Sequence, residues 1–103
     1  MAISNIVVST LETLLTKADT GATKVVFMLN CANTDSVTRV LTLYAYPSGG
    51  SLSDASMLVP PIEIPGKEVF IYNERLVLQN GDRVVAVADV AGKITVTPSS
   101  LVL

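Results

Sequence analysis

The amino-acid sequence predicts an all-β fold, an antiparallel, jelly-roll-like β-sandwich, on three observations. Runs rich in Val, Ile, Thr, Leu and Tyr are separated by turn signals about every 10 to 15 residues. Within the runs, apolar and polar residues alternate with the period of two that a strand requires. At 103 residues the chain has room for a single domain, 1–103. One antiparallel sheet of this composition would leave an apolar face in water, so two facing sheets are expected.

The start of the chain leaves its local structure open. Residues 1–10 contain no charged side chain and are expected to form an N-terminal arm. In the segment 9–17, Leu11, Leu14 and Leu15 have the spacing of one helix face. The β-branched threonines of the same segment suit a strand equally well, so both structures remain open.

The middle and the end of the chain assign side chains to strand faces. Over 23–31, one face holds Thr23, Val25, Phe27, Leu29 and Cys31, and the other holds Lys24 and Asn30. Over 37–46, Leu41 and Leu43 lie opposite Thr42 and Tyr44. Over 83–89, Val84, Ala86 and Ala88 alternate with Arg83, Val85, Val87 and Asp89, and near the C-terminus Ile94 and Val96 alternate with Thr95 and Thr97. Each alternation predicts an apolar face turned towards a second sheet.

Two segments between these strands carry further signals. Proline cannot donate a ladder hydrogen bond, so Pro60 and Pro61 place the segment 57–64 at a sheet edge or entering a strand. The segment 47–56 contains two glycines and four serines and is expected to be a long exposed loop. An arm that reaches a neighbouring subunit and a mobile connector are both compatible with it.

The composition indicates a surplus of apolar residues. Half of the residues are hydrophobic, only 16% are charged, and mean hydropathy is +0.54. Burial by a partner explains this surplus, because extended exposed apolar patches mark contact sites; strands rich in Val and Leu and buried on one face are the alternative. The candidate interface residues are Ile3, Ile6, Val7, Tyr46, Leu52, Met57, Leu58, Leu101 and Leu103.

Several classes of function lack the residues they need. There is no histidine, the commonest general base and zinc ligand, and Cys31 is the single cysteine. No catalytic, cofactor-binding or metal-binding residue is therefore assigned, and the chain is not expected to be an enzyme or to take a small-molecule substrate. A net charge of −2 without a basic run argues against nucleic acid. A membrane-spanning helix needs about 20 consecutive apolar residues, and the sequence contains no such run, so no membrane span is expected.

Seven short runs occur in a characteristic order along the chain from about Leu14 onward. They are Thr23-Lys24-Val25-Val26, Leu29-Asn30-Cys31-Ala32-Asn33-Thr34, Val40-Leu41-Thr42-Leu43, Pro47-Ser48-Gly49-Gly50-Ser51, Ile62-Glu63-Ile64-Pro65, Leu76-Val77-Leu78-Gln79-Asn80-Gly81-Asp82 and Ile94-Thr95-Val96-Thr97. In this order they resemble the small β-sandwich virion structural proteins of tailed bacteriophages. The match is poor at 18–21 and does not extend before Leu14, and it includes no catalytic motif.

The resemblance implies a structural role in the virion, with assembly in the host cytoplasm. The first hypothesis is a capsid decoration or cement protein, a homo-oligomer, and specifically a trimer, that binds across subunits of the major capsid protein and stabilises the shell. The alternative is a tail, neck or fibre module that binds a partner protein or a host-surface carbohydrate. For the carbohydrate, Tyr44, Tyr46 and Asp54 would provide aromatic and carboxylate groups. Head and tail locations both remain open.

Overall fold

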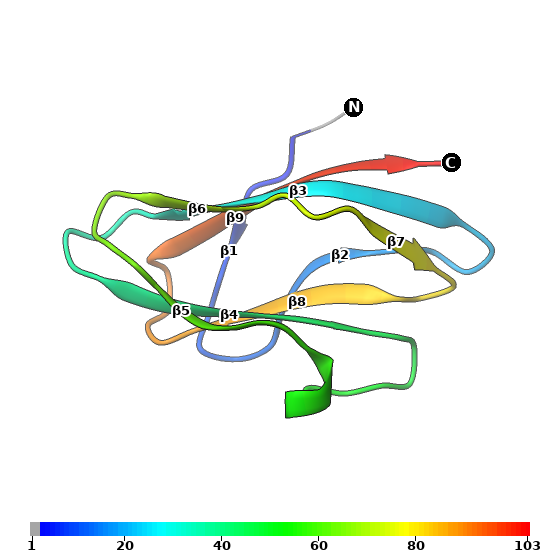
Figure 1. Cartoon of the computed structure of the whole chain (residues 1–103), viewed down its shortest axis with the longest axis horizontal. Coiled ribbons are helices and arrows are strands. Elements are labelled where there is room, and N and C mark those ends of the chain that lie inside the picture. Colours follow the sequence, from blue (N-terminus) through cyan, green and yellow to red (C-terminus); the bar gives the residue numbers. More distant parts are fainter. Residues whose placement is uncertain (1–2) are drawn as a thin grey trace.

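Two antiparallel sheets face each other in the computed structural model, which describes residues 3–103 (Figure 1). Sheet A has the order β1 (Ile6–Val7), β9 (Ile94–Val102), β3 (Thr23–Asn33) and β6 (Val69–Tyr72), and β7 (Leu76–Gln79) also pairs with β3. Sheet B has the order β2 (Thr13–Lys17), β8 (Arg83–Ala88), β4 (Arg39–Tyr46) and β5 (Met57–Ile64). A short 3-10 helix, η1 (Asp54–Ser56), precedes β5. The predicted β-sandwich is confirmed.

The chain passes repeatedly from one sheet to the other. With β7 set aside, the order β1-β9-β3-β6 faces the order β2-β8-β4-β5, so nearly every connection crosses between the sheets. This is the arrangement of a jelly roll, in which two Greek keys wrap around one core. No helix within residues 3–103 has the length and apolarity needed to cross a membrane.

The core lies between the sheets and is built from the predicted alternation. Leu41 and Leu43 of β4 in sheet B and Ile94 and Val96 of β9 in sheet A belong to one core cluster, and all four side chains are fully buried. A buried Leu, Ile or Val contributes about 1.5–3 kcal/mol relative to an exposed one. These strands therefore supply much of the driving force for the two sheets to close on each other.

Strand β3 departs from simple alternation. Its pairing with β9 shifts between Val26 and Met28, which is a β-bulge. The extra residue puts Leu29 and Cys31 into the core with Val26, whereas Phe27 is exposed. The prediction that Phe27 shares a face with Leu29 was wrong, because a bulge reverses the alternation along the strand.

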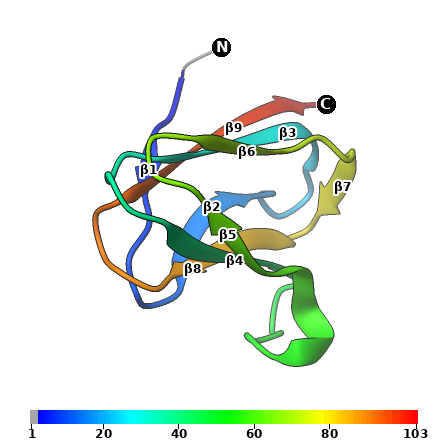
Figure 2. The same ribbon diagram turned by 60° about the vertical axis from the view of Figure 1, so that its left-hand side comes forward.

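The three segments whose structure the sequence left open contain two edge strands of sheet B and a loop with a short helix. Within 9–17, the residues Thr13–Lys17 form β2 at one edge of sheet B, so the strand alternative is confirmed over that part. Strand β5 forms the other edge of sheet B, and its pairing with β4 shifts register between Val59 and Ile62, so that Pro60 and Pro61 lie at an irregularity of the ladder. The loop 47–56 ends in η1 and stands out from the sandwich on the side of sheet B (Figure 2).

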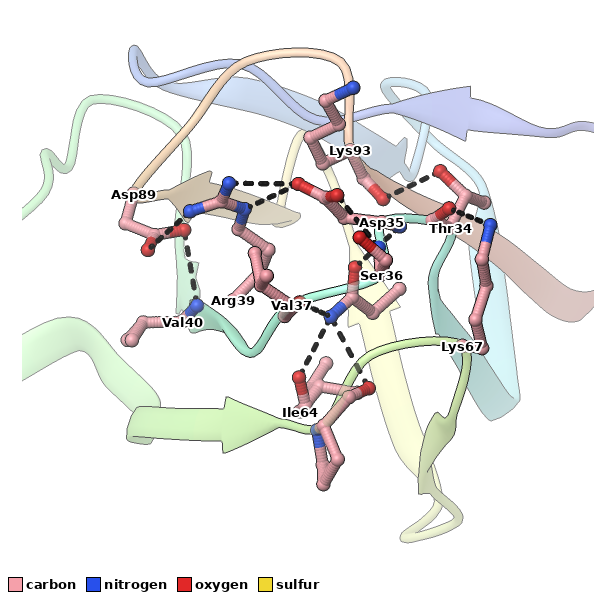
Figure 3. Close-up of polar contacts among 12 residues, drawn as sticks. Thr34, Asp35, Ser36, Val37, Arg39, Val40, Ile64, Lys67, Asp89 and Lys93 are labelled. Atoms are coloured by element: carbon pink, nitrogen blue, oxygen red, sulfur yellow. Dashed lines mark hydrogen bonds and ion pairs between the residues drawn. The ribbon is translucent and has the colours of Figure 1, made fainter.

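A polar network closes one end of the sandwich (Figure 3). The buried Asn33 amide nitrogen donates to the carbonyl oxygens of Val37 at 2.9 Å and Ile64 at 2.8 Å, with a longer contact of 3.3 Å to Pro65. Its carbonyl oxygen accepts the backbone N–H of Asp35 at 2.9 Å. One side chain at the end of β3 thus connects the β3–β4 turn to the β5–β6 turn and satisfies their buried backbone groups.

Charged side chains complete this end of the molecule. Arg39 contacts Asp35 at 2.8 Å and Asp89 at 3.9 Å, and Asp89 also accepts the backbone N–H of Val40 at 3.1 Å. The hydrogen bond from Arg39, together with the backbone N–H of Ser36, lowers the pKa of Asp35 below its usual value. The charged groups of Asp35, Arg39 and Asp89 contact one another and backbone N–H groups, so this network has a structural role in joining the turns at this end.

We expect the Asp35 carboxylate to make folding stability depend on acid. A group whose pKa is lowered by folding stabilises the protein above its unfolded-state pKa, and that contribution is lost as pH falls through the folded-state pKa. Between pH 5 and pH 2, roughly, wild type should therefore lose more stability than Asp35→Asn. Urea denaturation at several pH values measures the difference; parallel pH profiles for the two proteins would contradict it.

The Cys31 thiol is expected to be unreactive in the folded protein. It is fully buried, and desolvation raises its pKa to about 12, so almost no thiolate exists at neutral pH. Iodoacetamide should label Cys31 rapidly in urea and only at the rate of unfolding without it, as mass spectrometry over time would show. Rapid labelling under native conditions would mean that the centre of β3 is accessible.

Candidate interaction surface

The outer side of sheet A carries apolar side chains that no part of the described chain covers. We call this surface the A face. Its exposed large apolar residues come from all five strands of the sheet and are between 41% and 57% exposed: Val7, Phe27, Val69, Ile71, Val77 and Leu101. Their sequence neighbours on β6 and β7, among them Phe70 and Leu78, instead pack against the core.

Register places these residues next to one another across the strands. Val69 and Ile71 of β6 lie opposite Ala32 and Asn30 of β3. Further along β3, Val25 lies between Val77 of β7 and Leu101 of β9. The bulge that exposes Phe27 lies between these two groups. The apolar side chains therefore form one continuous surface over β3, β6 and β7, with the hydroxyl side chains of β9 beside it.

Charge is absent from the outward positions of sheet A within residues 3–103. The polar outward residues on β9 are Thr95, Thr97 and Ser99, which face Ala32, Asn30 and Met28 of β3. Arg75, in the turn between β6 and β7, lies over this surface, with its guanidinium carbon 5.7 Å from the centre of the Phe27 ring. The A face thus combines apolar and neutral hydroxyl groups.

The outer side of sheet B is different. Three of its four strands place a charged residue there: Lys17 on β2, Arg83 on β8 and Glu63 on β5. Arg83 lies over the Tyr46 ring at 5.9 Å, and the Tyr46 hydroxyl is hydrogen-bonded to Glu12. This hydrogen bond is the main cause of the raised pKa of Tyr46. The two outer surfaces therefore suit different partners.

A free strand edge and a projecting segment border the A face. Strand β9 is nine residues long, but β1 pairs only with its residues Thr95 and Val96. Val8 N–H donates to the Ile94 carbonyl, so the next positions to exchange hydrogen bonds would be Ile6 with Val96 and Ser4 with Pro98. Pro98 has no N–H, which explains why the ladder stops there.

Beyond Pro98 the chain leaves the edge of β9 open. Residues 3–5 turn away from the sandwich on the outer side of sheet A, as both views show (Figures 1 and 2). Asn5 is held by a hydrogen bond from the Thr97 hydroxyl at 2.8 Å, whereas Ile3 is 81% exposed. The segment 3–5 and the loop with η1 thus project from opposite sides of the molecule.

The candidate interface residues predicted from sequence fall into several places. Val7 and Leu101 lie on the A face, and Ile3 and Leu103 lie exposed near the two ends of the chain. Ile6 and Leu58 pack partly against the core. Leu52 and Met57 flank η1 and are half-buried, as is Tyr46 at the end of β4. Of the expected arm, residues 1–10, the first two lie outside the described residues, and Val8 is fully buried.

Sequence reasoning missed the centre of the A face: Phe27, Val69, Ile71 and Val77. One signal was present in the sequence of β6, Val-Phe-Ile-Tyr, which places large apolar or aromatic side chains on both faces of the strand. A strand that is apolar on both faces is expected to be covered on both.

A shallow groove beside Tyr46 lies at the opposite end of the sandwich from the polar network. It has a volume of about 280 Å³ and lies between the ends of β4, β7 and β8, lined by Ala45, Tyr46, Pro47, Leu76, Val77, Leu78, Asp82 and Arg83. Tyr46 is already engaged by Glu12 and Arg83, and Asp54 lies in η1. Within residues 3–103 no three acidic or cysteine side chains gather as a metal site would require.

Comparison with known proteins gives no relative: no protein family, curated protein or solved structure matches the chain.

Proposed function

We propose that this protein is a structural component of the virion of a tailed bacteriophage, and specifically a capsid decoration or cement protein. It acts as a homo-oligomer, a trimer, that binds across subunits of the major capsid protein. It has a structural and not a catalytic role, and it is located in the virion after assembly in the host cytoplasm.

The observation that carries this proposal is the uncharged A face beside the projecting segment 3–5. A monomer that stayed free in solution would be expected to place charges on both outer sheet surfaces, as sheet B does. The loop 47–56 projects on the other side of the sandwich (Figure 2). One subunit can therefore touch different neighbours through its two sides, as a protein that covers subunit junctions must. The jelly roll is also a recurrent fold of viral capsid proteins and lectins.

Binding to the assembled shell stabilises it by mass action. A protein that binds the closed shell and not the separate capsid subunits shifts the equilibrium towards the shell by an amount that grows with its concentration. The chain needs no reactive group for this, only a surface that matches the assembled state.

The test mixes the purified chain with empty shells made from the major capsid protein of the same phage genome. We expect saturable co-sedimentation and a higher temperature of shell disassembly by light scattering. No co-sedimentation at concentrations of about 100 µM would overturn the proposal.

The alternative, a tail, neck or fibre module, has a separate test on a glycan array. Saturable binding to a glycan that Tyr46→Ala abolishes, without binding to shells, would favour the carbohydrate-binding module. The contacts of Tyr46 with Glu12 and Arg83 make this the weaker proposal, because a sugar would have to compete with them.

A further inference from the structure

We infer that the A face is the surface through which copies of this chain associate with one another. The inference deepens the self-association part of the proposed function by assigning it to one face of the sandwich. In the resulting trimer the A faces of the three subunits meet around the threefold axis, so that Phe27, Ile71 and Val77 of one subunit are covered by sheet A of its neighbours.

The first argument is area. Six apolar side chains from the five strands of the A face are between 41% and 57% exposed. The largest apolar patch of a typical monomer covers about 300–600 Å² and often has a function. A specific interface of standard size buries about 800 Å² on each partner, including its polar rim. The A face with its row of hydroxyl groups on β9 is therefore large enough to support a stable contact by itself.

The second argument is electrostatic. A strongly charged partner would find no complementary charge at the outward strand positions of sheet A within the described chain, while Arg75 from the β6–β7 turn lies over Phe27. A second copy meets the face without repulsion between like charges. It also offers hydroxyl groups that can pair with the hydroxyl groups of Thr95 and Thr97. Sheet B, with Lys17, Glu63 and Arg83, is the side that suits a charged surface.

The third argument is the position of the segment 3–5. It rises beside the A face on its outer side (Figure 1), where a subunit seated on that face would contact it. Ile3 is the most exposed large apolar side chain among the described residues, at 81%. A neighbour on the A face would cover it as well, which adds apolar area to the contact.

The experiment compares two lysine substitutions at matched exposure. Ile71, on the A face, is 52% exposed, and Leu14, on the outer side of sheet B, is 48% exposed. Oligomeric state is measured by sedimentation equilibrium and native mass spectrometry from about 1 to 100 µM. We expect wild type and Leu14→Lys to form the same oligomer, and Ile71→Lys to dissociate with a Kd at least about 100-fold higher because it buries a charge.

Folding and shell binding are measured on the same three proteins. Protection of Cys31 from iodoacetamide reports that each variant is folded, so a monomeric Ile71→Lys protein is not an unfolded one. The inference is overturned if wild type is monomeric throughout, or if Leu14→Lys dissociates and Ile71→Lys does not. If a monomeric wild type binds shells and Ile71→Lys abolishes that binding, the A face contacts the capsid. The shell-binding part of the proposed function then stands, and this inference with its self-association does not.

Discussion

Replacing Gly66 with alanine is expected to lower the free energy of unfolding by about 3 kcal/mol or more. A Cβ atom at this position would lie 2.3 Å from the carbonyl oxygen of Ser36 and 2.9 Å from the backbone nitrogen of Val37. Both are backbone atoms, so no side-chain rotation relieves the overlap. The turns also resist separation, because the Lys67 N–H donates to the Asp35 carbonyl at 2.9 Å. Denaturation in urea followed by circular dichroism measures the effect.

Gly92→Ala is the matched control. Gly92 has a positive φ of 80°, but a Cβ there meets nothing within 4 Å. Its cost is therefore that of a left-handed backbone alone, about 1–2 kcal/mol. If Gly66→Ala is no more destabilised than this control, the close approach of the β3–β4 and β5–β6 turns is not part of the folded protein.

The second large effect is expected for Asn33→Ala, which should lose about 3 kcal/mol of stability. The substitution removes the donor to the carbonyls of Val37 and Ile64 and the acceptor for the Asp35 N–H. Because Asn33 is buried, those backbone groups would be left without partners and without water. The same urea denaturation measures the loss.

Asn30 on the same strand provides the comparison. Its side-chain oxygen is buried and finds no hydrogen-bond partner among the residues that the structure describes. The Asn30 oxygen loses its hydration on folding without gaining a hydrogen bond, and removing it removes that unfavourable contribution. Asn30→Ala should therefore change the free energy of unfolding by less than about 1 kcal/mol. Equal losses for the two variants would show that the cost at Asn33 is one of side-chain volume and not of hydrogen bonding.

The parts of the fold that could be predicted from sequence are those in which one face of a strand is buried. Leu41 and Leu43, and Ile94 and Val96, alternate with polar or half-exposed residues, and the structure buries all four. The edge position of Pro60 and Pro61 followed from the chemistry of the proline nitrogen. In each case the residues of the strand itself are sufficient for the prediction, because neither the alternation nor the missing N–H of proline requires knowledge of which strand lies next to it.

The rest depends on contacts between distant segments. The bulge at Phe27 is defined by the register of β3 against β9, about 70 residues away along the chain, and no alternation within β3 reveals it. Nothing in the sequence around Asn33 indicates its role, because its amide joins two turns that only the folded chain brings together. The centre of the A face was missed for the same reason, since a surface exists only when five strands lie side by side.

Pro98 limits how far an assembly of copies of this chain can extend by adding strands at the edge of β9. Strand β1 covers only the start of β9, and the rest of this nine-residue strand could accept an extended segment and pass a new free edge to the next molecule. Pro98 lies in the middle of β9 and lacks an N–H, so the edge that β1 leaves uncovered provides only a short template. If copies of this chain associate as inferred above, the short edge protects them from forming endless fibres. Its assemblies can end at a finite size.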